Sequence, residues 1–393
     1  MEKDIIQQAD QVIAKTYKRF PIVITKGQGC RLWDKNGKSY VDFVAGIAVC
    51  NLGHAHPRIA TALSKQANIL VHTSNLYYTM PQIELAQWLT ANSFADRVFF
   101  CNSGAEANEA AIKLARKYFK DKGENNRFKI ISMEKSFHGR TMATLSATGQ
   151  DKIRKGFEPE LEGFEYVPFN DPDALRKKLD LTTCAVLVEP VQGEGGVRCP
   201  SPDYFETVRQ MCSETGVLLI FDEIQTGIGR TGKLFAYEHF AIEPDIMTLA
   251  KALGNGLPIG AMLAKEHVAD AFGPGSHAST FGGTPLITAA SLEVVNTLVE
   301  ENILDRCVSA GEYFRERLCW LKDRHSSVKD VRGVGLLLGM KLEIDGDAVV
   351  TSCMDKGFLI NCIQGDILRF VPPLTIGREE IDALVACLDE VLP

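Results

Sequence analysis

Apolar runs that suit strands alternate with amphipathic stretches that suit helices over most of the chain. Short apolar runs between polar residues are typical of buried strands, and apolar positions three or four apart are typical of helices. The expected strands are 97–101, 128–133, 185–188, 217–221 and 246–249, and the expected helices are 64–70, 81–89, 105–120 and 202–214. This alternation predicts an α/β fold with a mainly parallel central sheet and helices on both faces.

The two ends of the chain follow a different pattern. Residues 31–43 surround Asn36 and Gly37, a dipeptide typical of a hairpin turn, and this hairpin is expected to lie outside the main sheet. After about Pro285, a long helix leads into a mixed segment with expected strands at 335–341 and 367–371. We therefore expect a large domain at 51–284 and a smaller α+β domain at 285–393, which the N-terminal segment 1–50 joins.

The composition is that of an ordinary folded protein. Of 393 residues, 45% are hydrophobic and 24% are charged, and 43 basic against 50 acidic residues give a formal net charge of -7. Because this balance provides no positive field, nucleic acid and anionic membranes are not expected partners. The apolar runs are too short to span a membrane, and the N-terminal residues lack the apolar stretch of a signal peptide. A cytoplasmic protein is expected.

Cysteine and histidine spacing gives no indication of a metal site. Eleven cysteines are present without a CxxC pair, which argues against a zinc ribbon or a disulfide framework and predicts reduced thiols. His54 and His56 lie two positions apart in a turn that contains glycine and proline, and no third ligand is near them in the sequence. Structural roles are therefore favoured for both histidines.

The segment CNSGAEA (101–107) marks a strand that turns into a helix. The first backbone N–H groups of a helix have no partner within it, and Gly104 would let an anion such as a phosphate approach them. Ser103 and Glu106 also fit an ordinary capping box. This pattern alone leaves both interpretations open.

The apolar strand VLLIFDEIQ (217–225) ends in two adjacent carboxylates, Asp222 and Glu223. Successive side chains of a strand point to opposite faces, so only one of the two can enter a given cleft. Such a carboxylate could bond only to backbone groups. Alternatively, it could be the counter-ion of a metal or of a protonated ring nitrogen.

The segment GIGRTGK (227–233) satisfies the GxGxxG pattern and nearly matches a phosphate-binding loop. However, Leu234 replaces the serine or threonine that would hold magnesium, and the following LFAYEHF gives no clean amphipathic helix. Nucleotide binding is therefore not expected here.

Lys251 lies in the apolar segment MTLAKALGNGLPIG (247–260), directly before a glycine-rich turn. Desolvation favours the neutral amine, which is the nucleophile that forms a Schiff base with an aldehyde. An anion-binding helix start, a strand-end acid and a buried lysine together fit pyridoxal 5'-phosphate. This cofactor needs donors for its phosphate, a carboxylate for its pyridinium and a lysine for its aldehyde.

Six motifs, in the same order along the chain, resemble those of the class III pyridoxal-phosphate aminotransferases. They are FFCNSGAEANEAAIKLAR (99–116), SFHGRT (136–141), VEPVQGEGG (188–196), FDEIQTGIGRTG (221–232), LAKALGNGLPIGA (249–261) and HASTFGGTP (277–285). The resemblance covers essentially the whole chain. It implies fold type I, a homodimer and an active site at the subunit boundary.

The resemblance also assigns roles to individual residues. It implies that Lys251 holds the cofactor's aldehyde and later moves the proton, and that Asp222 pairs with the pyridinium nitrogen. The other implied phosphate contacts are Ser103, Gly104 and Ala105, together with Thr280, which each subunit would supply to the cofactor bound in the other. The implied ring contacts are Phe137 and Ile224 on the two ring faces and Gln225 at the ring hydroxyl. The implied substrate contacts are Arg140 as a carboxylate clamp, Ser279, Glu194 and Arg369.

Three further motifs indicate the substrate. NLGHAHP (51–57), HTSNLYYT (72–79) and LRFVPPLTI (368–376) are similar to the branch of the family that acts on N2-acetylornithine. The implied reaction moves the terminal amino group of N2-acetylornithine to 2-oxoglutarate, giving N-acetylglutamate 5-semialdehyde and glutamate in arginine biosynthesis. Ile47 stands where ornithine aminotransferases tend to carry tyrosine, which weakens free ornithine as the main donor.

Other donors and other classes of protein stay as alternatives. Succinylornithine, N-succinyl-diaminopimelate, ornithine and 4-aminobutyrate also carry a terminal amine. A mutase of the same fold is less favoured, because Glu194 and Arg369 suit two alternating substrates. A non-catalytic cofactor-binding or scaffold protein would be expected to lack Lys251 or Asp222, and both are present.

Overall fold

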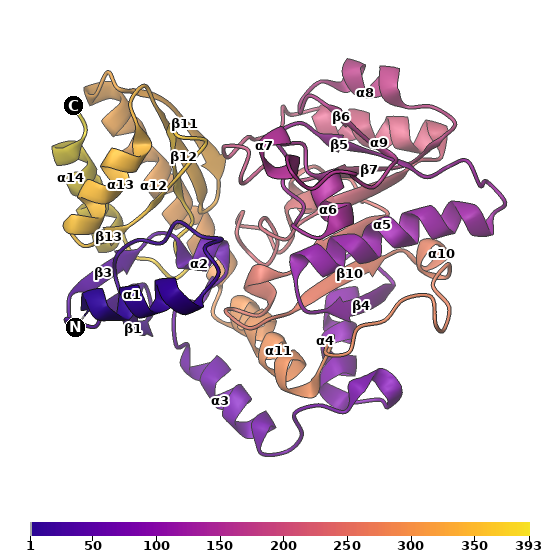
Figure 1. Cartoon of the computed structure of the whole chain (residues 1–393), viewed down its shortest axis with the longest axis horizontal. Coiled ribbons are helices and arrows are strands. Elements are labelled where there is room, and N and C mark those ends of the chain that lie inside the picture. Colours follow the sequence, from indigo (N-terminus) through magenta and orange to yellow (C-terminus); the bar gives the residue numbers. More distant parts are fainter. Residues whose placement is uncertain (1) are drawn as a thin grey trace.

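The computed structural model describes residues 2–393, which form three β-sheets (Figure 1). The largest sheet has seven strands in the order β4-β10-β9-β8-β7-β5-β6. Its strands are β4 (Arg97–Cys101), β5 (Lys129–Met133), β6 (Phe164–Val167), β7 (Thr183–Val188), β8 (Leu218–Asp222), β9 (Ile246–Leu249) and β10 (Gly260–Ala264). Strands β5 to β9 pair in parallel, whereas β10 is antiparallel to β4 and β9. The predicted, mainly parallel sheet is confirmed.

Apolar side chains cover both faces of this sheet. On one face, Ile130 and Ile220 belong to the same core cluster as residues of α5 (Gly104–Asp121). On the other face, Ile131 belongs to a cluster with residues of α9 (Tyr204–Thr215). Adjacent positions of one strand thus serve opposite cores, as expected of a parallel sheet between two helical layers. Two strands, β6 and β10, are not among those predicted, because FEYV and GAMLA are short runs next to glycine.

Two four-stranded sheets lie beside the large one. One contains β1 (Ile24–Gln28), β2 (Arg31–Asp34), β3 (Ser39–Asp42) and β13 (Phe358–Leu359), and the other contains β11 (Val328–Val334), β12 (Leu337–Leu342), β14 (Asn361–Ile363) and β15 (Ile367–Phe370). β2 and β3 form the predicted hairpin, and β3 pairs in parallel with β13. The N-terminal hairpin therefore shares a sheet with the C-terminal part of the chain. The domain boundaries after residues 50 and 284 stay a prediction.

The remaining helices connect and cover these sheets (Figure 1). They are α1 (Glu2–Val12), α2 (Ala45–Ala48), α3 (Pro57–Ala67), α4 (Met80–Ala91), α6 (Met142–Ala147), α7 (Asp151–Arg154), α8 (Pro172–Lys178), α10 (Glu266–Ala269), α11 (Pro285–Glu300), α12 (Ile303–Arg324), α13 (Gly346–Asp355) and α14 (Arg378–Val391), with short 3-10 turns η1 (Ser74–Leu76), η2 (Ala236–His239) and η3 (Lys251–Leu253). The helix predicted at 64–70 was wrong in its bounds. It begins at Pro57, because proline suits the first helical turn, and it ends at Ala67.

Two features of the described part of the chain concern membranes and metals. None of its helices is long and apolar enough to cross a membrane. Within the same residues, no group of three or more His, Cys, Asp and Glu side chains is placed to hold a metal ion.

The GIGRTGK segment (227–233) is a buried connection between the large sheet and the smaller ones. The Arg230 side chain is fully buried, and its Nη1 donates to the carbonyl oxygens of Leu336 (2.9 Å) and Pro372 (2.7 Å). Its Nη2 donates to Oδ1 of Asn51. Burial lowers the pKa of Arg230 to about 10. The residues after the segment form only the 3-10 turn η2, so no long helix begins here to bind a phosphate.

Replacing Arg230 with leucine should lower the free energy of unfolding by about 3 kcal/mol or more, because three buried acceptors would lose their donor. Urea unfolding followed by circular dichroism measures this change. The matched control is Lys233→Leu, a change at an exposed residue of the same segment, which should stay within about 0.5 kcal/mol of the wild type. Equal unfolding free energies for Arg230→Leu and the wild type would contradict the structural role.

Candidate active site

A cavity of about 490 Å³ lies beyond the carboxyl ends of strands β4, β5, β7, β8 and β9. Ligands of open α/β sheets bind at this edge. Ten of the predicted site residues line the cavity: Ser103, Gly104, Ala105, Phe137, Arg140, Glu194, Asp222, Ile224, Gln225 and Lys251. Five segments far apart in the sequence thus meet at one place.

The N-terminus of α5 forms one wall of the cavity. Ser103 is its N-cap, and its Oγ accepts a hydrogen bond from the N–H of Glu106 (3.2 Å). The Glu106 carboxylate accepts from the N–H of Asn102 rather than from that of Ser103, so the predicted capping box is only half formed. The N–H groups of Gly104 and Ala105 have no hydrogen-bond partner among the described residues. They are available to an anion in the cavity.

Gly104 also allows close packing at this wall. A Cβ atom at this position would lie 2.7 Å from Cδ1 of Ile224, which lines the same cavity. Any larger residue would therefore push Ile224 from its place.

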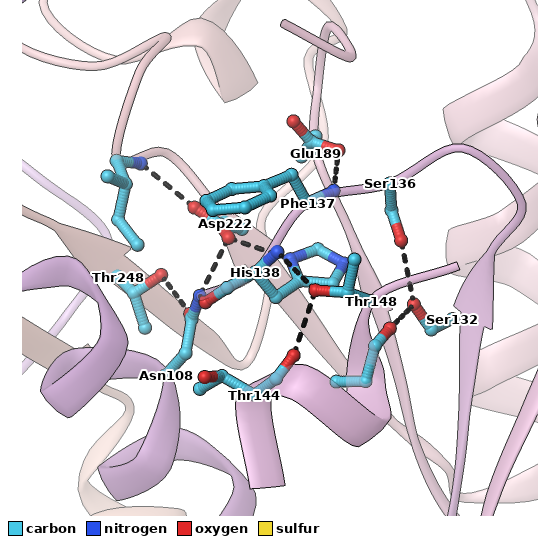
Figure 2. Close-up of polar contacts among 12 residues, drawn as sticks. Asn108, Ser132, Ser136, Phe137, His138, Thr144, Thr148, Glu189, Asp222 and Thr248 are labelled. Carbon is cyan, nitrogen blue, oxygen red and sulfur yellow. Dashed lines mark hydrogen bonds and ion pairs between the residues drawn. The ribbon is translucent and has the colours of Figure 1, made fainter. Parts of the chain in front are cut away.

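Asp222 ends strand β8 and is held by three donors (Figure 2). Its Oδ2 accepts from Nδ2 of Asn108 (2.7 Å) and lies 2.8 Å from Nδ1 of His138, and its Oδ1 accepts from the N–H of Ile224 (3.1 Å). Asn108 is fixed in turn, because its Oδ1 accepts from the hydroxyl of Thr248 (2.8 Å). The carboxylate is only 4% exposed, so these donors fix its orientation at the cavity wall.

The neighbouring Glu223 points to the other side of the strand, as the two-residue period predicts. Its carboxylate accepts from the N–H groups of Ala236 and Tyr237 and from the hydroxyl of Thr226. Burial raises the pKa of Glu223 to about 7. Glu223 therefore satisfies backbone donors, and Asp222 is the carboxylate that lines the cavity.

Lys251 follows β9 and begins the 3-10 turn η3. Its φ is 44°, a left-handed conformation that costs a side-chain-bearing residue on the order of 1 kcal/mol or more. Burial lowers the pKa of the Lys251 amine, against the opposing effect of Glu194. The side chain lines the cavity, where this environment favours the neutral, nucleophilic amine.

Phe137 and Arg140 follow strand β5. The Arg140 guanidinium carbon lies 5.6 Å from the centre of the Phe137 ring. The N–H of Phe137 donates to the Glu189 carboxylate (3.1 Å), which fixes this backbone at the cavity wall (Figure 2). Arg140 is exposed and makes no ion pair with a described residue, so its guanidinium is available to a carboxylate.

Glu194, in the loop after β7, forms an ion pair with Arg369 of the small sheet. Arg369 belongs to β15, is 1% exposed and also donates to Oδ1 of Asn361 (3.4 Å). Burial acts to raise the pKa of Glu194, but Arg369, Lys251 and Gln225 together outweigh it and the pKa is lowered. Glu194 lines the main cavity. Arg369 does not line it and lies behind Glu194, with which it forms the ion pair.

Ser279 and Thr280 do not line the cavity that contains Lys251. Both line a neighbouring cavity of about 460 Å³, and Asn102 joins the two cavities because it lines both. Its Nδ2 donates to the hydroxyl of Ser279 (3.1 Å). The chain by itself therefore does not bring Thr280 to the cavity that contains Lys251.

Sequence reasoning missed Asn108, the contact of His138 with Asp222, and Glu189. Burial and the nearby Asp222 raise the pKa of Glu189 well above its ordinary value, and its carboxylate accepts from the N–H groups of Phe137 and Gly193. Two signals were present in the sequence. Asn108 is a polar residue on the apolar face of its helix, and Glu189 directly follows an apolar strand.

Comparisons with known proteins agree with this geometry. The family model described as "Aminotransferase class-III" matches residues 12–392. The chain belongs to this family. Among class III relatives, a protein named acetylornithine aminotransferase from Caldanaerobacter subterraneus subsp. tengcongensis is 52% identical over 99% of both chains. Another of that name, from Methanocaldococcus jannaschii, is 50% identical over 95% of this chain and 94% of the relative.

Solved structures of aminotransferases have the same fold. The ornithine aminotransferase from Toxoplasma gondii superimposes with a TM-score of 0.96 at 36% identity, covering 99% of this chain and 94% of that one. The acetylornithine aminotransferase from Elizabethkingia anophelis gives a TM-score of 0.89 at 34% identity, covering 100% and 98%. The predicted fold type of pyridoxal-phosphate-dependent transferases is confirmed.

The residues of the cavity fit pyridoxal 5'-phosphate, the cofactor of class III aminotransferases. Oε1 of Gln225 is buried without a hydrogen-bond partner in the described structure, as expected of a group that awaits a ligand. The free N–H groups of Gly104 and Ala105, the carboxylate of Asp222 and the amine of Lys251 supply the other functions that the cofactor needs.

A left-handed turn borders the cavity. Residues 45–48 all have positive φ, between 49° and 67°, and Val49 directly after them lines the cavity. Oδ1 of Asp42 accepts from the two N–H groups at the start of the turn (2.8 and 2.9 Å), and its Oδ2 lies 2.7 Å from Nε2 of His54. The Asp42–His54 pair therefore supports a backbone conformation that is otherwise unfavourable. This structural role of His54 is the one that the sequence favours.

This pair predicts a pH-dependent stability. The hydrogen bond to Asp42 raises the pKa of His54 from 6.5 to about 9. A raised folded-state pKa contributes stability that is complete below pH 6.5 and lost as the pH rises to about 9. The difference in unfolding free energy between the wild type and His54→Gln should therefore shrink by roughly 1–3 kcal/mol over this range. Urea unfolding at several pH values measures it.

His56→Gln is the matched control in the same turn. Burial lowers the pKa of His56, so its contribution changes below pH 6.5 and should stay constant between pH 6.5 and 9. A His54→Gln difference that is independent of pH over this range would show that the ion pair does not stabilise the turn.

Proposed function

We propose that the protein transfers the terminal amino group of N2-acetylornithine to 2-oxoglutarate, giving N-acetylglutamate 5-semialdehyde and glutamate, and that it serves arginine biosynthesis in the cytoplasm. The observation that carries the proposal is the similarity to proteins named acetylornithine aminotransferase, at 52% and 50% identity over at least 95% of this chain. The structures named ornithine aminotransferase are more distant, at 36% identity or less. The structure named acetylornithine aminotransferase is similarly distant at 34%, so the case against ornithine rests on the 52% and 50% identities.

The residues of the cavity would hold the cofactor from all sides. When bound, pyridoxal 5'-phosphate supplies an aldehyde for the donor amine and a ring that takes up electrons. The N–H groups of Gly104 and Ala105 at the start of α5 would bind its phosphate, with Ser103 as the N-cap. Phe137 and Ile224 would contact the two ring faces, and Gln225 would donate to or accept from the ring hydroxyl.

Two residues would carry the chemistry. Lys251 would hold the aldehyde and, once released, would use its Nζ to move a proton at the donor's terminal carbon. Asp222 would keep the ring nitrogen protonated, because a buried carboxylate stabilises a positive charge beside it. The bonds from Asn108 and His138 would keep its carboxylate aimed at that nitrogen.

Substrate carboxylates would bind at two places. Arg140 would hold the carboxylate that lies far from the reacting amine of N2-acetylornithine. Glutamate also carries a carboxylate on its reacting carbon, which needs a cation near the cofactor. Arg369 would provide that cation when Glu194 moves aside, and the Glu194–Arg369 pair would close again for the terminal-amine donor.

The functional unit would be a homodimer with shared active sites. Large apolar side chains are exposed around η1 and α4 and on the loop that carries Thr280, among them Leu76, Tyr77, Tyr78, Met80 and Phe281. Asn75 joins these two segments, because its Nδ2 donates to the carbonyls of Ser279 (3.1 Å) and Gly282 (2.9 Å). Such a patch is typical of a protein interface. It would place Thr280 at the phosphate of the other subunit and Ser279 near the substrate.

A donor panel with the purified enzyme and 2-oxoglutarate tests the proposal. N2-acetylornithine should give the highest kcat/KM for glutamate formation, above succinylornithine, N-succinyl-diaminopimelate, ornithine and 4-aminobutyrate. Lys251→Ala is the control protein. It should keep the cofactor through the phosphate contacts, as its absorbance shows, but lose steady-state turnover. Substantial turnover by Lys251→Ala, or a higher kcat/KM for another donor, would reject the respective part of the proposal.

Glu194→Ala tests the switch between the two substrates. The change frees Arg369, which should favour the half-reaction with glutamate over the half-reaction with N2-acetylornithine by about tenfold, since it leaves an uncompensated cation beside the terminal-amine donor. Single-turnover rates with each substrate measure the two half-reactions separately. Equal losses in both would instead indicate that the pair is a static link between the sheets.

A further inference from the structure

A further cavity of about 430 Å³, called the second cavity below, adjoins the one that Lys251 lines and differs from the one that Ser279 and Thr280 line. Lys251 does not line it. The two cavities share Phe137, Arg140 and Glu194. The other walls of the second cavity come from two parts of the chain: Gln150, Lys152 and Ile153 at the start of α7, and Cys362, Ile363 and Gln364 in and after β14. In Figure 1, α7 lies on the side of the large sheet that faces the small sheet with β11 and β12.

The charged groups that line this second cavity are predominantly positive. They are Arg140, Lys152 and Glu194, and Arg369 neutralises Glu194 in the ion pair described above. Neither Arg140 nor Lys152 forms an ion pair with any residue that the structure describes, and both are exposed to solvent. The acid next to Lys152 in the chain, Asp151, does not line the cavity and pairs with Arg154. The cavity therefore offers two cations without a protein counter-ion.

Hydrogen bonds fix the walls around these cations. Nε2 of Gln364 donates to the carbonyl oxygen of Glu194 (2.7 Å), which ties the β14 side of the cavity to the loop after β7. Nε2 of Gln150 donates to the carbonyl oxygen of Ser136 (2.9 Å), next to Phe137. These side-chain-to-backbone bonds tie the walls of the cavity to the segments that carry Glu194 and Phe137.

Arg140 lines both cavities, so a donor whose terminal amine reacts beside Lys251 and whose carboxylate binds Arg140 would place its α-carbon where the two cavities meet. The substituent on the α-nitrogen then lies among the same residues, because it is attached to the same carbon as the carboxylate. In N2-acetylornithine this nitrogen is a neutral amide, whereas in ornithine it is an ammonium ion. Two unpaired cations attract the carboxylate in both donors but repel only the ammonium of ornithine.

We propose that Lys152 is a specificity-determining residue, which together with Arg140 selects donors whose α-nitrogen is uncharged. The inference rests on the proposed function, since it concerns the choice among terminal-amine donors. Lys152 would contribute attraction for the distant carboxylate and repulsion of a free α-ammonium. Acylated donors and donors without an α-nitrogen would both escape this repulsion.

A comparison of three donors distinguishes the effect of the α-ammonium charge from the effect of the acyl group. N2-acetylornithine, ornithine and 5-aminovalerate share the terminal amine and the distant carboxylate, and 5-aminovalerate has no α-nitrogen. Because the kcat/KM of a donor in a ping-pong reaction reports only the half-reaction with that donor, ratios between donors isolate this site. The wild type should use 5-aminovalerate more efficiently than ornithine, although 5-aminovalerate lacks an acyl group.

Lys152→Glu should raise the kcat/KM of ornithine relative to both other donors by about tenfold or more, which corresponds to about 1.4 kcal/mol between like and opposite charges near the protein surface. Lys152→Arg, which keeps the charge, should leave the ratios within about threefold. The matched control is Lys155→Glu, an equally large change of charge at an exposed residue that follows α7 and does not line the cavity. It should leave the ratios unchanged. The effect of Lys152→Glu should weaken as the salt concentration rises.

The outcomes separate this inference from the proposed function. Equal changes of kcat/KM for all three donors in Lys152→Glu, or the same shift in Lys155→Glu, would overturn the role of Lys152 while leaving the activity in place. Wild-type enzyme that uses ornithine as efficiently as N2-acetylornithine would also overturn it. Absence of turnover by the wild type with every donor would refute the proposed function, and the inference that rests on it.

Discussion

Parallel strands end at the same edge of a sheet, and this constraint organises the whole active site. Segments that follow β4, β5, β7, β8 and β9 all reach one cavity, although they are distant in sequence. A helix that begins at such an edge offers unpaired N–H groups, and a strand that ends there can turn one carboxylate toward the ligand. The free N–H groups at the start of α5, the acid Asp222 and the amine of Lys251 all meet because of this arrangement.

The charges in the cavity are stabilised by fixed partners because burial makes an unpaired charge unfavourable. Asp222 is held by Asn108, His138 and a backbone N–H, and Arg369 is held by Glu194. Lys251 has no such ion pair in the described structure, and burial shifts its amine toward the neutral form. The site therefore holds an oriented carboxylate near an amine whose pKa burial lowers, and aminotransferase chemistry uses both groups.

The smaller sheets complete the site from the other side. Arg369 comes from β15, the wall with Gln364 follows β14, and the left-handed turn that leads to Val49 begins at the end of β3. The part of the cavity that would meet the distant end of the donor thus lies where the small sheets approach the large one. Chemistry at the amine would thus depend on the large sheet, whereas selection of the donor would depend on how the large and small sheets are joined. The buried Arg230 is one link between them.

The sequence by itself determined the local features. Apolar periodicity predicted the parallel sheet and most of its strands, the two-residue period separated Asp222 from Glu223, and the motifs indicated the class III family and the residues that line the cavity. The pairing of Glu194 with Arg369, 175 positions away, was implied by the family resemblance. The contact of Asp222 with Asn108, 114 positions away, was decided only by the tertiary structure. The same holds for the cavity that joins Lys152 to Gln364. Periodicity reflects interactions between near neighbours along the chain, whereas such contacts depend on strand order and on how the sheets pack against each other.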